Sequence, residues 1–367
     1  MKRIAIKEVC EVYDGPHATP KKTDNGPVYL GIDAITEDGM LDLSQFAHLS
    51  EEDYVKWTKR VTPQENDIVF SYEATLGRYA VIPKNFYGCL GRRLAIVRII
   101  NDELNAKWLY YYFRSPEWTS FIKNQTVKGS TVDRISIEEF PEYTIPVISL
   151  EDQNKIVDVL DKIDRKIADN KKINDYLEQQ ALLIFRYMFK NISNGSNHVG
   201  DYITPKRGKA LLSKDAIPGQ FPVIAGGLLP ATYHNRANTV APVLTISGSG
   251  ANAGYVNIWH DPIWSSDSSF IDYEMTTNVY FWYAFLKLRQ QDIFDIQTGS
   301  AQPHIYPKHI AELSIGNMDR FQIASYITQV TPLFTKAGAN IRETKRLQQL
   351  RDWLLPMLMN GQVTIED

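Results

Sequence analysis

The chain has 367 residues, of which 44% are hydrophobic and 23% charged, a composition that excludes a disordered or fibrous protein and predicts two or three globular domains. The formal net charge is −3. Residues 1–149 hold 18 basic and 21 acidic residues and residues 198–317 hold 8 and 9, so neither region has the strong positive charge typical of many DNA-binding domains.

The N-terminus and the cysteines indicate a cytoplasmic protein. Residues 1–8 lack the apolar core of a secretory signal, and the longest apolar stretch, residues 280–286, is too short to span a membrane. Cys10 and Cys89 have no CxxC partner, so we expect neither a disulfide framework nor a structural zinc site.

The first region, residues 1–148, mixes the two secondary-structure patterns. Short runs at 67–71 and 94–100 are rich in β-branched residues and predict strands, while residues 107–114 and 116–124 predict helices. This region is therefore expected to be a mixed α+β domain.

Residues 149–193 predict one long helix. Ser149, with an acid three residues later, resembles a capping box, and apolar residues then recur at alternating spacings of four and three. The predicted seam contains Ile156, Leu160, Ile163, Ile167, Leu177 and Ile184. Asn170 and Asn174 fall on the same seam, where they would fix the register; the alternative is that both lie on the exposed edge of a wider apolar face.

The second half repeats this organisation. Residues 198–317 predict a second mixed domain, and residues 318–360 predict a second long helix. Its predicted seam contains Ile327, Phe334, Ile341, Leu347, Leu350 and Leu354. Because each long helix carries a narrow apolar stripe that needs a partner, we expect the two to pair antiparallel as a coiled-coil spacer.

The two halves are also related in sequence. Gly77 is matched by Gly254, the aromatic run at 108–113 by that at 280–285, and Gly129-Ser130 by Gly299-Ser300. Ordered matches at an offset of about 170 residues indicate an internal duplication and predict two similar domains related by a pseudo-two-fold axis.

Motifs for catalysis are missing from the sequence. It contains no GxxxxGK[ST] phosphate loop, no HExxH metal motif, no GxSxG nucleophile motif and no Asn/Asp-Pro-Pro-aromatic tetrapeptide of the adenine methyltransferase type. The histidines lack metal-ligand spacing, so we predict neither a metal site nor a catalytic residue in this chain.

The order domain–helix–domain–helix resembles the specificity subunit of type I DNA restriction-modification systems. In that family an aromatic helix, a Gly-Ser/Thr loop, an Ile-Pro step and a Gln-x-x-Ile signature follow one another, and here they correspond to residues 107–113, 128–131, 145–146 and 153–156. The second copy departs from this pattern, with Ile315-Gly316 at the Ile-Pro step and a compressed signature starting at Gln322.

The resemblance implies a non-catalytic DNA reader with two target-recognition domains. It further implies two methyltransferase subunits and additional restriction or motor subunits as partners. S-adenosylmethionine, ATP and Mg²⁺ would then be bound by those partners and not by this chain. Since the two domains differ in sequence, the implied target is bipartite and asymmetric, and helix length would set the gap between its half-sites.

Candidate DNA-binding residues are those whose side chains suit base edges or phosphates and that lie in predicted loops. In the first domain they are Lys21, Lys22, Lys59, Arg60, Arg78, Arg92, Arg93, Lys128, Ser130 and Thr131. In the second domain they are Lys206, Arg207, Lys209, Arg236, Ser249, Asn252, Ser300, Gln302 and His304. The Gly-Ser loops are favoured because glycine permits a close backbone approach and both copies carry the loop at the same place.

Three alternatives stay open at this point. The same architecture could serve another restriction class, with one fused methyltransferase-nuclease partner. The near-neutral charge of both domains also suits a coiled-coil scaffold that binds proteins but not DNA. An independent enzyme is the third alternative, and the missing cofactor and metal motifs argue against it.

Overall fold

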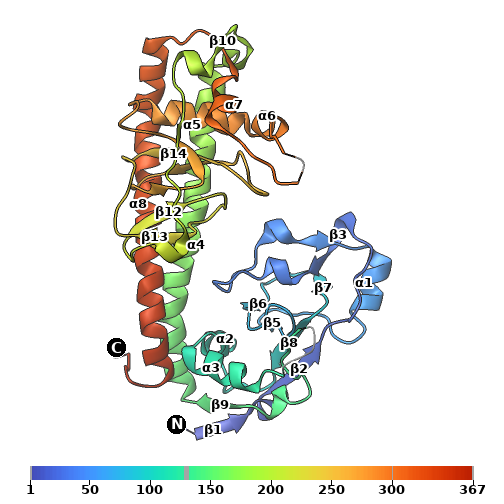
Figure 1. Ribbon diagram of the computed structural model, residues 1–367. Helices are drawn as coiled ribbons and strands as arrows, with labels where there is room; N and C mark the ends of the chain where they lie inside the picture. The colour runs from blue at the N-terminus through green and yellow to red at the C-terminus, as the bar shows by residue number, and fades with distance from the viewer. Residues whose placement is uncertain (1, 128–131, 300, 366–367) are drawn as a thin grey trace. The chain divides into compact units, whose positions relative to one another are not determined.

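The structure is a computed structural model that describes residues 2–127, 132–299 and 301–365. The predicted mixed class is confirmed, because helices and several small sheets alternate along the chain (Figure 1). The chain forms two compact units: unit 1 contains Met1–Arg165 and Leu347–Asp367, and unit 2 contains Lys166–Arg346. Each long helix therefore contributes residues to both units, and the expected boundaries at 148, 193 and 317 remain predictions.

Unit 1 contains a four-stranded antiparallel sheet with the order β2-β8-β5-β6 and a three-stranded sheet with the order β4-β3-β7. Strands β3 and β7 pair in parallel, and a separate antiparallel pair joins β1 to β9. The strands are β1 (Lys2–Ala5), β2 (Cys10–Asp14), β3 (Thr23–Leu30), β4 (Ala47–His48), β5 (Ile68–Ser71), β6 (Tyr79–Val81), β7 (Gly88–Leu90), β8 (Leu94–Ile99) and β9 (Thr144–Val147). The helices are α1 (Glu51–Trp57), α2 (Ala106–Phe113) and α3 (Pro116–Gln125).

Unit 2 has the same connectivity. Its four-stranded sheet has the order β11-β17-β14-β15, its three-stranded sheet the order β13-β12-β16 with β12 and β16 parallel, and β10 pairs with β18. The strands are β10 (Asn197–His198), β11 (Lys206–Arg207), β12 (Phe221–Ile224), β13 (Thr232–His234), β14 (Val243–Ser247), β15 (Val256–Trp259), β16 (Trp264–Ser265), β17 (Ser268–Asp272) and β18 (Ser314–Ile315). The helices are α5 (Val279–Leu288), α6 (Gln290–Asp295) and α7 (Pro307–Ala311). The internal repeat is thus confirmed strand by strand.

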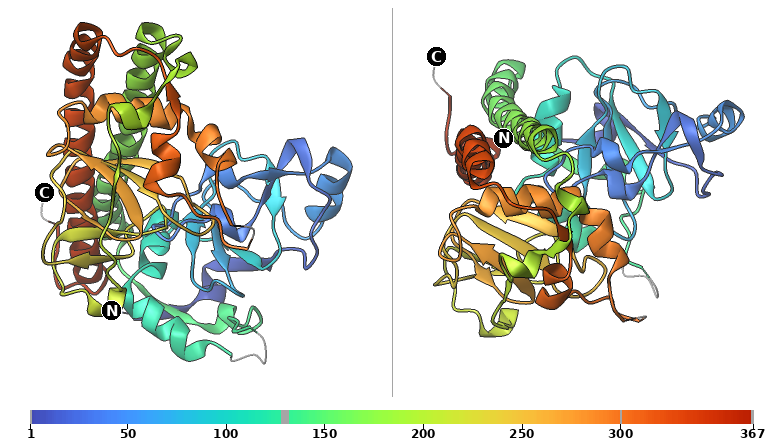
Figure 2. Two further views of the ribbon diagram at one scale, coloured as in Figure 1. Left: turned by 45° about the horizontal axis from the view of Figure 1, so that its top comes forward. Right: turned by 90° about the horizontal axis from the view of Figure 1, so that it is seen from above.

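The aromatic runs form the cores of the two units. Phe113 of α2 packs on Trp118 of α3 in the first core, and Phe281 of α5 packs on Phe185 of α4 in the second. Trp108 and Phe285 are buried in the same two cores. In the right view of Figure 2, α5 (orange) lies beside the two long helices. Because these rings fill the interior, they are not available as stacking platforms for bases.

The long helices are α4 (Leu150–Met188) and α8 (Arg320–Met359). In unit 1, Ile156 and Leu160 pack in one cluster with Leu355 and Leu358. In unit 2, Phe185 of α4 and Phe189, the residue just after α4, pack on Tyr326 of α8 in a second cluster. Of the residues predicted on the seam, Ile156, Leu160, Ile163, Ile167 and Phe334 are buried, and Leu177, Ile184, Ile327, Leu347 and Leu354 are half-buried.

Two seam assignments were wrong. Ile341 is 49% exposed and Leu350 is 42% exposed. The buried face of α8 instead passes through the neighbouring polar residues Asn340 and Arg351, which are 1% and 7% exposed. The hydrophobic pattern assigned the seam to the apolar neighbour in each case, because it takes no account of polar side chains that are buried with a partner.

The polar contacts of α4 and α8 in unit 2 form a ladder. Asn170 is 1% exposed and its Nδ2 donates to Glu343 Oε2 at 2.9 Å. Asn174 Nδ2 donates to the Ala337 carbonyl at 3.2 Å, and its Oδ1 accepts from Asn340 Nδ2 at 2.8 Å. Both asparagines therefore lie on the seam and not on an exposed edge. Cross-helix hydrogen bonds of this kind fix the register of the pair.

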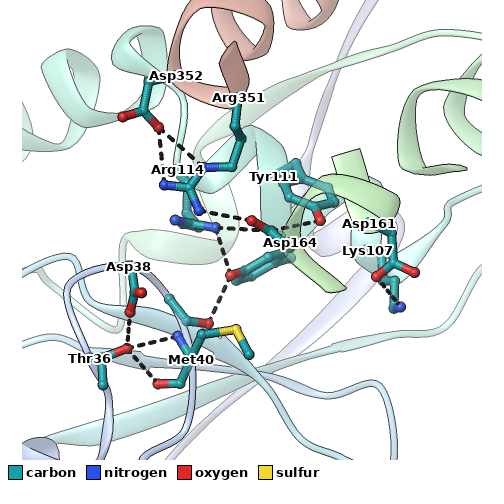
Figure 3. Close-up of polar contacts among 12 residues, drawn as sticks. Thr36, Asp38, Met40, Lys107, Tyr111, Arg114, Asp161, Asp164, Arg351 and Asp352 are labelled. Atoms are coloured by element: carbon teal, nitrogen blue, oxygen red, sulfur yellow. Dashed lines mark hydrogen bonds and ion pairs between the residues drawn. The ribbon is translucent and has the colours of Figure 1, made fainter. Parts of the chain in front are cut away.

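In unit 1, charged side chains connect α4 and α8 (Figure 3). Arg351 of α8 donates to Asp164 Oδ1 of α4 at 2.8 Å, and Tyr111 of α2 donates to Asp164 Oδ2 at 2.9 Å. Arg114 lies 3.8 Å from the same carboxylate and donates to Tyr110 at 2.8 Å. This mostly buried network ties α2, α4 and α8 together within unit 1.

Candidate nucleic-acid interface

The Gln-x-x-Ile signature has a structural role in unit 1. Gln153 is fully buried in the first turn of α4, where its Oε1 accepts the Asn105 N–H at 2.8 Å and its Nε2 donates to the carbonyls of Glu103 and Ile148 at 3.0 Å. In the second copy, Gln322 is exposed and donates to the Met188 carbonyl at 2.7 Å. The glutamine of the signature therefore stabilises one end of a long helix, and the signature does not contribute to a DNA-binding surface.

In each unit, several loops lie at one edge of the four-stranded sheet. The loops of the two units occupy equivalent positions in the repeat. After β5, the Tyr72 N–H donates to the Arg93 carbonyl and the Tyr72 carbonyl accepts from Ile135. After β14, Gly248 makes the same two bonds, with Asp267 and Ile305. This register makes Tyr72 equivalent to Gly248 and Arg93 equivalent to Asp267. The edge is therefore the place to compare what the two domains present to a ligand.

The loops that carry the Gly-Ser motifs start from this edge. Their bases are closed by backbone bonds between Val127 and Arg134 in unit 1 and between Thr298 and His304 in unit 2. Gly299 has φ +94°, and a Cβ there would lie 2.5 Å from the Gln302 carbonyl oxygen, so only glycine fits. The predicted residues Lys128, Ser130, Thr131 and Ser300 lie outside the described residues.

In unit 1 the edge carries an acid at its centre. Asp14, the last residue of β2, accepts from Arg60 Nη1 at 2.8 Å and lies 3.0 Å from His17 Nε2. Nearby, Arg93 Nε pairs with Glu73 at 3.1 Å. We call Asp14, His17, Arg60, Tyr72, Glu73 and Arg93 the unit 1 edge cluster.

The pKa of Tyr72 reflects the charges of this cluster. Burial raises the pKa of its hydroxyl, and the negative charges of Asp14 and Glu73 raise it further. The positive charges of Arg60 and Arg92 act in the opposite direction. Acids and bases therefore alternate around one tyrosine, and the edge has no single sign of charge.

In unit 2 the same edge carries an arginine at its centre. Arg207, the last residue of β11, pairs through Nη2 with Asp267, whose second oxygen accepts from the Ser249 hydroxyl. The guanidinium carbon lies 6.0 Å from the centre of the Tyr306 ring, and His304 stacks on that ring. We call Arg207, Gly248, Ser249, Asp267, His304 and Tyr306 the unit 2 edge cluster.

The structure gathers only some of the predicted DNA-binding residues at these edges. Arg60, Arg93, Arg207, Ser249 and His304 belong to the clusters, and Arg92 is close to Tyr72. Arg78 is directed elsewhere, since its Nη1 donates to the Ile35 carbonyl at 3.0 Å. Outside the clusters lie Lys21, Lys22, Lys59, Lys206, Lys209, Arg236 and Gln302, which are exposed, and Asn252, which is half-buried.

Several members of the clusters were not among the predicted DNA-binding residues. Asp14, Glu73 and Asp267 were passed over because only cations, amides and hydroxyls were sought as DNA ligands, and Tyr306 because its neighbours gave no pattern. The repeat offered a signal for Glu73, since Ser249 was a candidate and lies at the equivalent strand end. A carboxylate that orients an arginine indicates a binding site as clearly as the arginine itself does.

The structure adds two observations about other kinds of site. Among residues 2–127, 132–299 and 301–365, no group of three or more histidine, cysteine, aspartate or glutamate side chains is arranged to hold a metal ion. Over the same ranges, no helix is both long enough and apolar enough to cross a lipid bilayer.

The chain is similar to known proteins of one family. The family model "Type I restriction modification DNA specificity domain" matches residues 1–179. Over 361 residues the chain is 23% identical to the type I restriction enzyme MjaIX specificity subunit of Methanocaldococcus jannaschii, which covers 87% of this chain and 82% of that protein. A putative type I restriction enzyme specificity subunit of Haemophilus influenzae is 28% identical over 123 residues, covering 32% of this chain and 29% of that one.

A solved structure shares the fold. The S subunit of a type I restriction-modification system from M. genitalium aligns with a TM-score of 0.57 and 19% identity, over 97% of this chain and 95% of that one.

Proposed function

We propose that this chain, which belongs to the specificity subunits of type I restriction-modification systems, reads a bipartite, asymmetric DNA site with the two domains of its internal repeat. As a specificity subunit it recognises DNA sequence and does not itself catalyse. The observation that carries the bipartite site is the pair of edge clusters, in which equivalent positions hold Asp14 in one domain and Arg207 in the other. Different donors and acceptors at the same place select different bases.

The near-neutral charge of the domains is compatible with this role. Phosphate contacts supply most of the affinity of a DNA complex, while base contacts supply its sequence preference. We propose that the modification subunits contribute much of the phosphate binding, so that this chain binds DNA tightly only within the complex. Helices α4 and α8 would act as the spacer that sets the gap between the half-sites.

Two exposed apolar stripes support two docking sites for methyltransferase subunits. On the unit 2 part of α4, Ile173, Tyr176, Leu183 and Tyr187 are exposed at spacings of three, seven and four residues, which places them on one face. On the unit 1 part of α8, Leu350 and Trp353 are exposed. Leu183 and Trp353 are each 62% exposed and are 170 residues apart, which is the offset of the repeat. An exposed apolar residue at one equivalent position of each helix supports two copies of one partner.

The cofactors follow from this division of labour. We propose that S-adenosylmethionine is bound by the methyltransferase subunits and that ATP and Mg²⁺ are bound by the restriction subunits. The modified base would be an adenine that is rotated out of the duplex into the partner's pocket.

The experiment that tests the function is a single-base methylome of the host with the gene intact, deleted and restored. We expect deletion to remove one split, asymmetric adenine-methylated motif and restoration to return it. An unchanged methylome in a host that expresses this chain together with its partner subunits would contradict the DNA-reading role and favour a protein scaffold. Co-purification separates the two restriction classes, because a fused methyltransferase-nuclease would appear in place of separate subunits.

The docking stripes make a prediction of their own. Leu183→Glu should weaken capture of the modification subunit at one site and Trp353→Glu at the other, because each places a charge in an apolar contact. The double variant should lose both copies, as measured by the mass of the purified complex. Asp175→Lys, at an exposed position of α4 that is not three, four or seven residues from any stripe residue, is the matched control. A complex with two bound copies in the double variant would rule out these surfaces.

A further inference from the structure

The edge cluster of unit 2 contains an arginine that is held in place but remains accessible. Arg207 lies opposite Ser269 of β17, at the last paired position of β11. Its Nη2 is fixed by Asp267, and Asp267 is fixed in turn by the Ser249 hydroxyl. The side chains of Arg207 and Asp267 are each 37% exposed, so the guanidinium can still reach a ligand.

Gly248 provides the space in which this arginine lies. A Cβ at Gly248 would overlap Arg207 Nη1 and would lie 2.8 Å from Asp267 Oδ1. Any other residue at this position would therefore displace the guanidinium. In unit 1 the equivalent residue is Tyr72, whose ring is buried in the core, and the residue at the place of Arg207 is Asp14. The space that accommodates an arginine side chain at this position is thus specific to unit 2.

The arrangement suits a base edge better than a phosphate. A phosphate contact requires only positive charge, and the carboxylate of Asp267 beside the guanidinium would repel a phosphate. A neutral guanine edge presents two acceptors, O6 and N7, which require the paired N–H donors of an arginine in a fixed orientation. Asp267 takes one N–H of Nη2 and holds the plane of the guanidinium, so the other donors remain for the base.

We propose that Arg207 is a specificity-determining residue of the second domain and that it reads a guanine in one half-site of the target. Asp267, Ser249 and Gly248 are positioning residues that act through Arg207. This inference rests on the proposed function, because it assumes that the chain directs methylation to a defined sequence.

The test uses the whole complex, purified with its methyltransferase subunits and presented with a DNA library randomised at each position of the wild-type motif. Arg207→Ala should lower the preference for guanine at one position by roughly 10- to 100-fold, the range expected for one bidentate contact. All positions of the other half-site should keep their preference. Arg207→Lys should show a similar loss, since lysine keeps the charge but has no planar pair of donors.

Gly248→Ala supplies a variant in which no charge is removed. It should reduce the preference for guanine at the same position of the site, because the added methyl group displaces the guanidinium of Arg207. Lys214→Ala is the control: it removes one exposed positive charge from the same unit without touching the cluster, and the motif should not change. Thermal unfolding of each variant shows that the fold is retained.

Three results would overturn the inference. If Arg207→Ala and Gly248→Ala both keep the wild-type preference at every position, the Arg207–Asp267 pair serves only the fold. If Arg207→Ala weakens methylation equally at all sequences and reduces the dependence on salt, Arg207 contacts a phosphate. If the wild-type complex itself shows no preferred motif, the proposed function fails as well, and this outcome is distinguishable from the other two.

Discussion

The edge clusters of the two units place opposite charges at the same point of the same sheet. Where unit 1 has Asp14 and Arg93, unit 2 has Arg207 and Asp267. The strands behind them do not differ in this way: β5 and β14 are buried along their whole length in both units. The buried residues of these strands maintain the same sheet in both units. The residues just beyond the strand ends lie outside the core, so they can differ without disturbing the sheet.

The helices show a second difference between the units. Unit 1 holds its α4 and α8 segments together with the ion pair Arg351–Asp164, whereas unit 2 uses the neutral amides of Asn170, Asn174 and Asn340. Loss of one partner has different consequences in the two cases, because an unpaired buried charge is far more costly than an unpaired amide.

The largest expected effect follows from breaking this ion pair. Arg351→Met should destabilise unit 1 by about 2–3 kcal/mol, because the mostly buried carboxylate of Asp164 loses its 2.8 Å bond to Arg351. It keeps only Tyr111 and the more distant Arg114, 3.8 Å away. Hydrogen exchange should rise in residues 150–165 and 347–359 and stay unchanged in unit 2. The double variant Arg351→Met/Asp164→Leu should recover much of the loss. Equal loss of protection in both units would contradict the assignment of this pair to unit 1.

The amide ladder gives the matched comparison in unit 2. Asn170→Leu removes hydrogen bonds to Glu343 and Thr344 but leaves no buried charge, so we expect it to cost less than Arg351→Met. Chemical denaturation of the two variants under one set of conditions tests this order.

A smaller effect concerns pH and unit 2 alone. Burial lowers the pKa of His260 to about 4, with Asp261 acting against this shift and Arg342 adding to it. The unfolded state binds a proton near pH 6.5, so the stability contribution of neutral His260 is complete above pH 6.5 and is lost as the pH falls towards 4. At pH 5 the loss is about 2 kcal/mol.

Hydrogen exchange of unit 2 at pH 7 and pH 5, corrected for the intrinsic pH dependence of exchange, measures this loss. His260→Phe should reduce the difference, since phenylalanine has no proton to bind and suits a site that already contacts the ring of Phe334. An equal difference in the wild type and the variant would show that other groups are responsible.

The smallest expected effect tests the edge of unit 1. Asp14→Asn should change base preference roughly tenfold in the half-site that Arg207→Ala leaves unchanged, because an aspartate held by Arg60 suits the amino group of a cytosine. Glu8→Gln, in the same unit but away from the cluster, is the control. A change in both half-sites would contradict independent reading by the two domains.

The sequence predicted the architecture because that depends on repeated patterns. The offset of about 170 residues rests on ordered matches between the two halves, and the strand at 67–71 and the helices at 107–114 and 116–124 rest on apolar patterns; the structure contains each of them. The seam failed only at Ile341 and Leu350, where a buried polar residue lies next to an apolar one. Periodicity cannot identify a polar side chain that is stabilised by a partner about 170 residues away.

The edge clusters were harder to predict. Arg207 was chosen for its charge, but its significance depends on Asp267 and Gly248, which lie 60 and 41 residues further along the chain and meet it only through the sheet register. No local pattern links the three residues. The cluster becomes visible once β11, β17 and β14 are known to be neighbours.

The strand pairs β1–β9 and β10–β18 have a consequence for the gene. Residues 2–5 pair with residues 144–147, and residues 197–198 pair with residues 314–315, so the two ends of each domain are adjacent. A DNA segment that encodes the second domain can then be exchanged by recombination between related genes, with crossovers in the stretches that encode α4 and α8, and the new domain joins the helices at the same points. Under the proposed function, one such event changes one half-site while the other domain and the helices are inherited intact, so a population acquires a new methylation pattern.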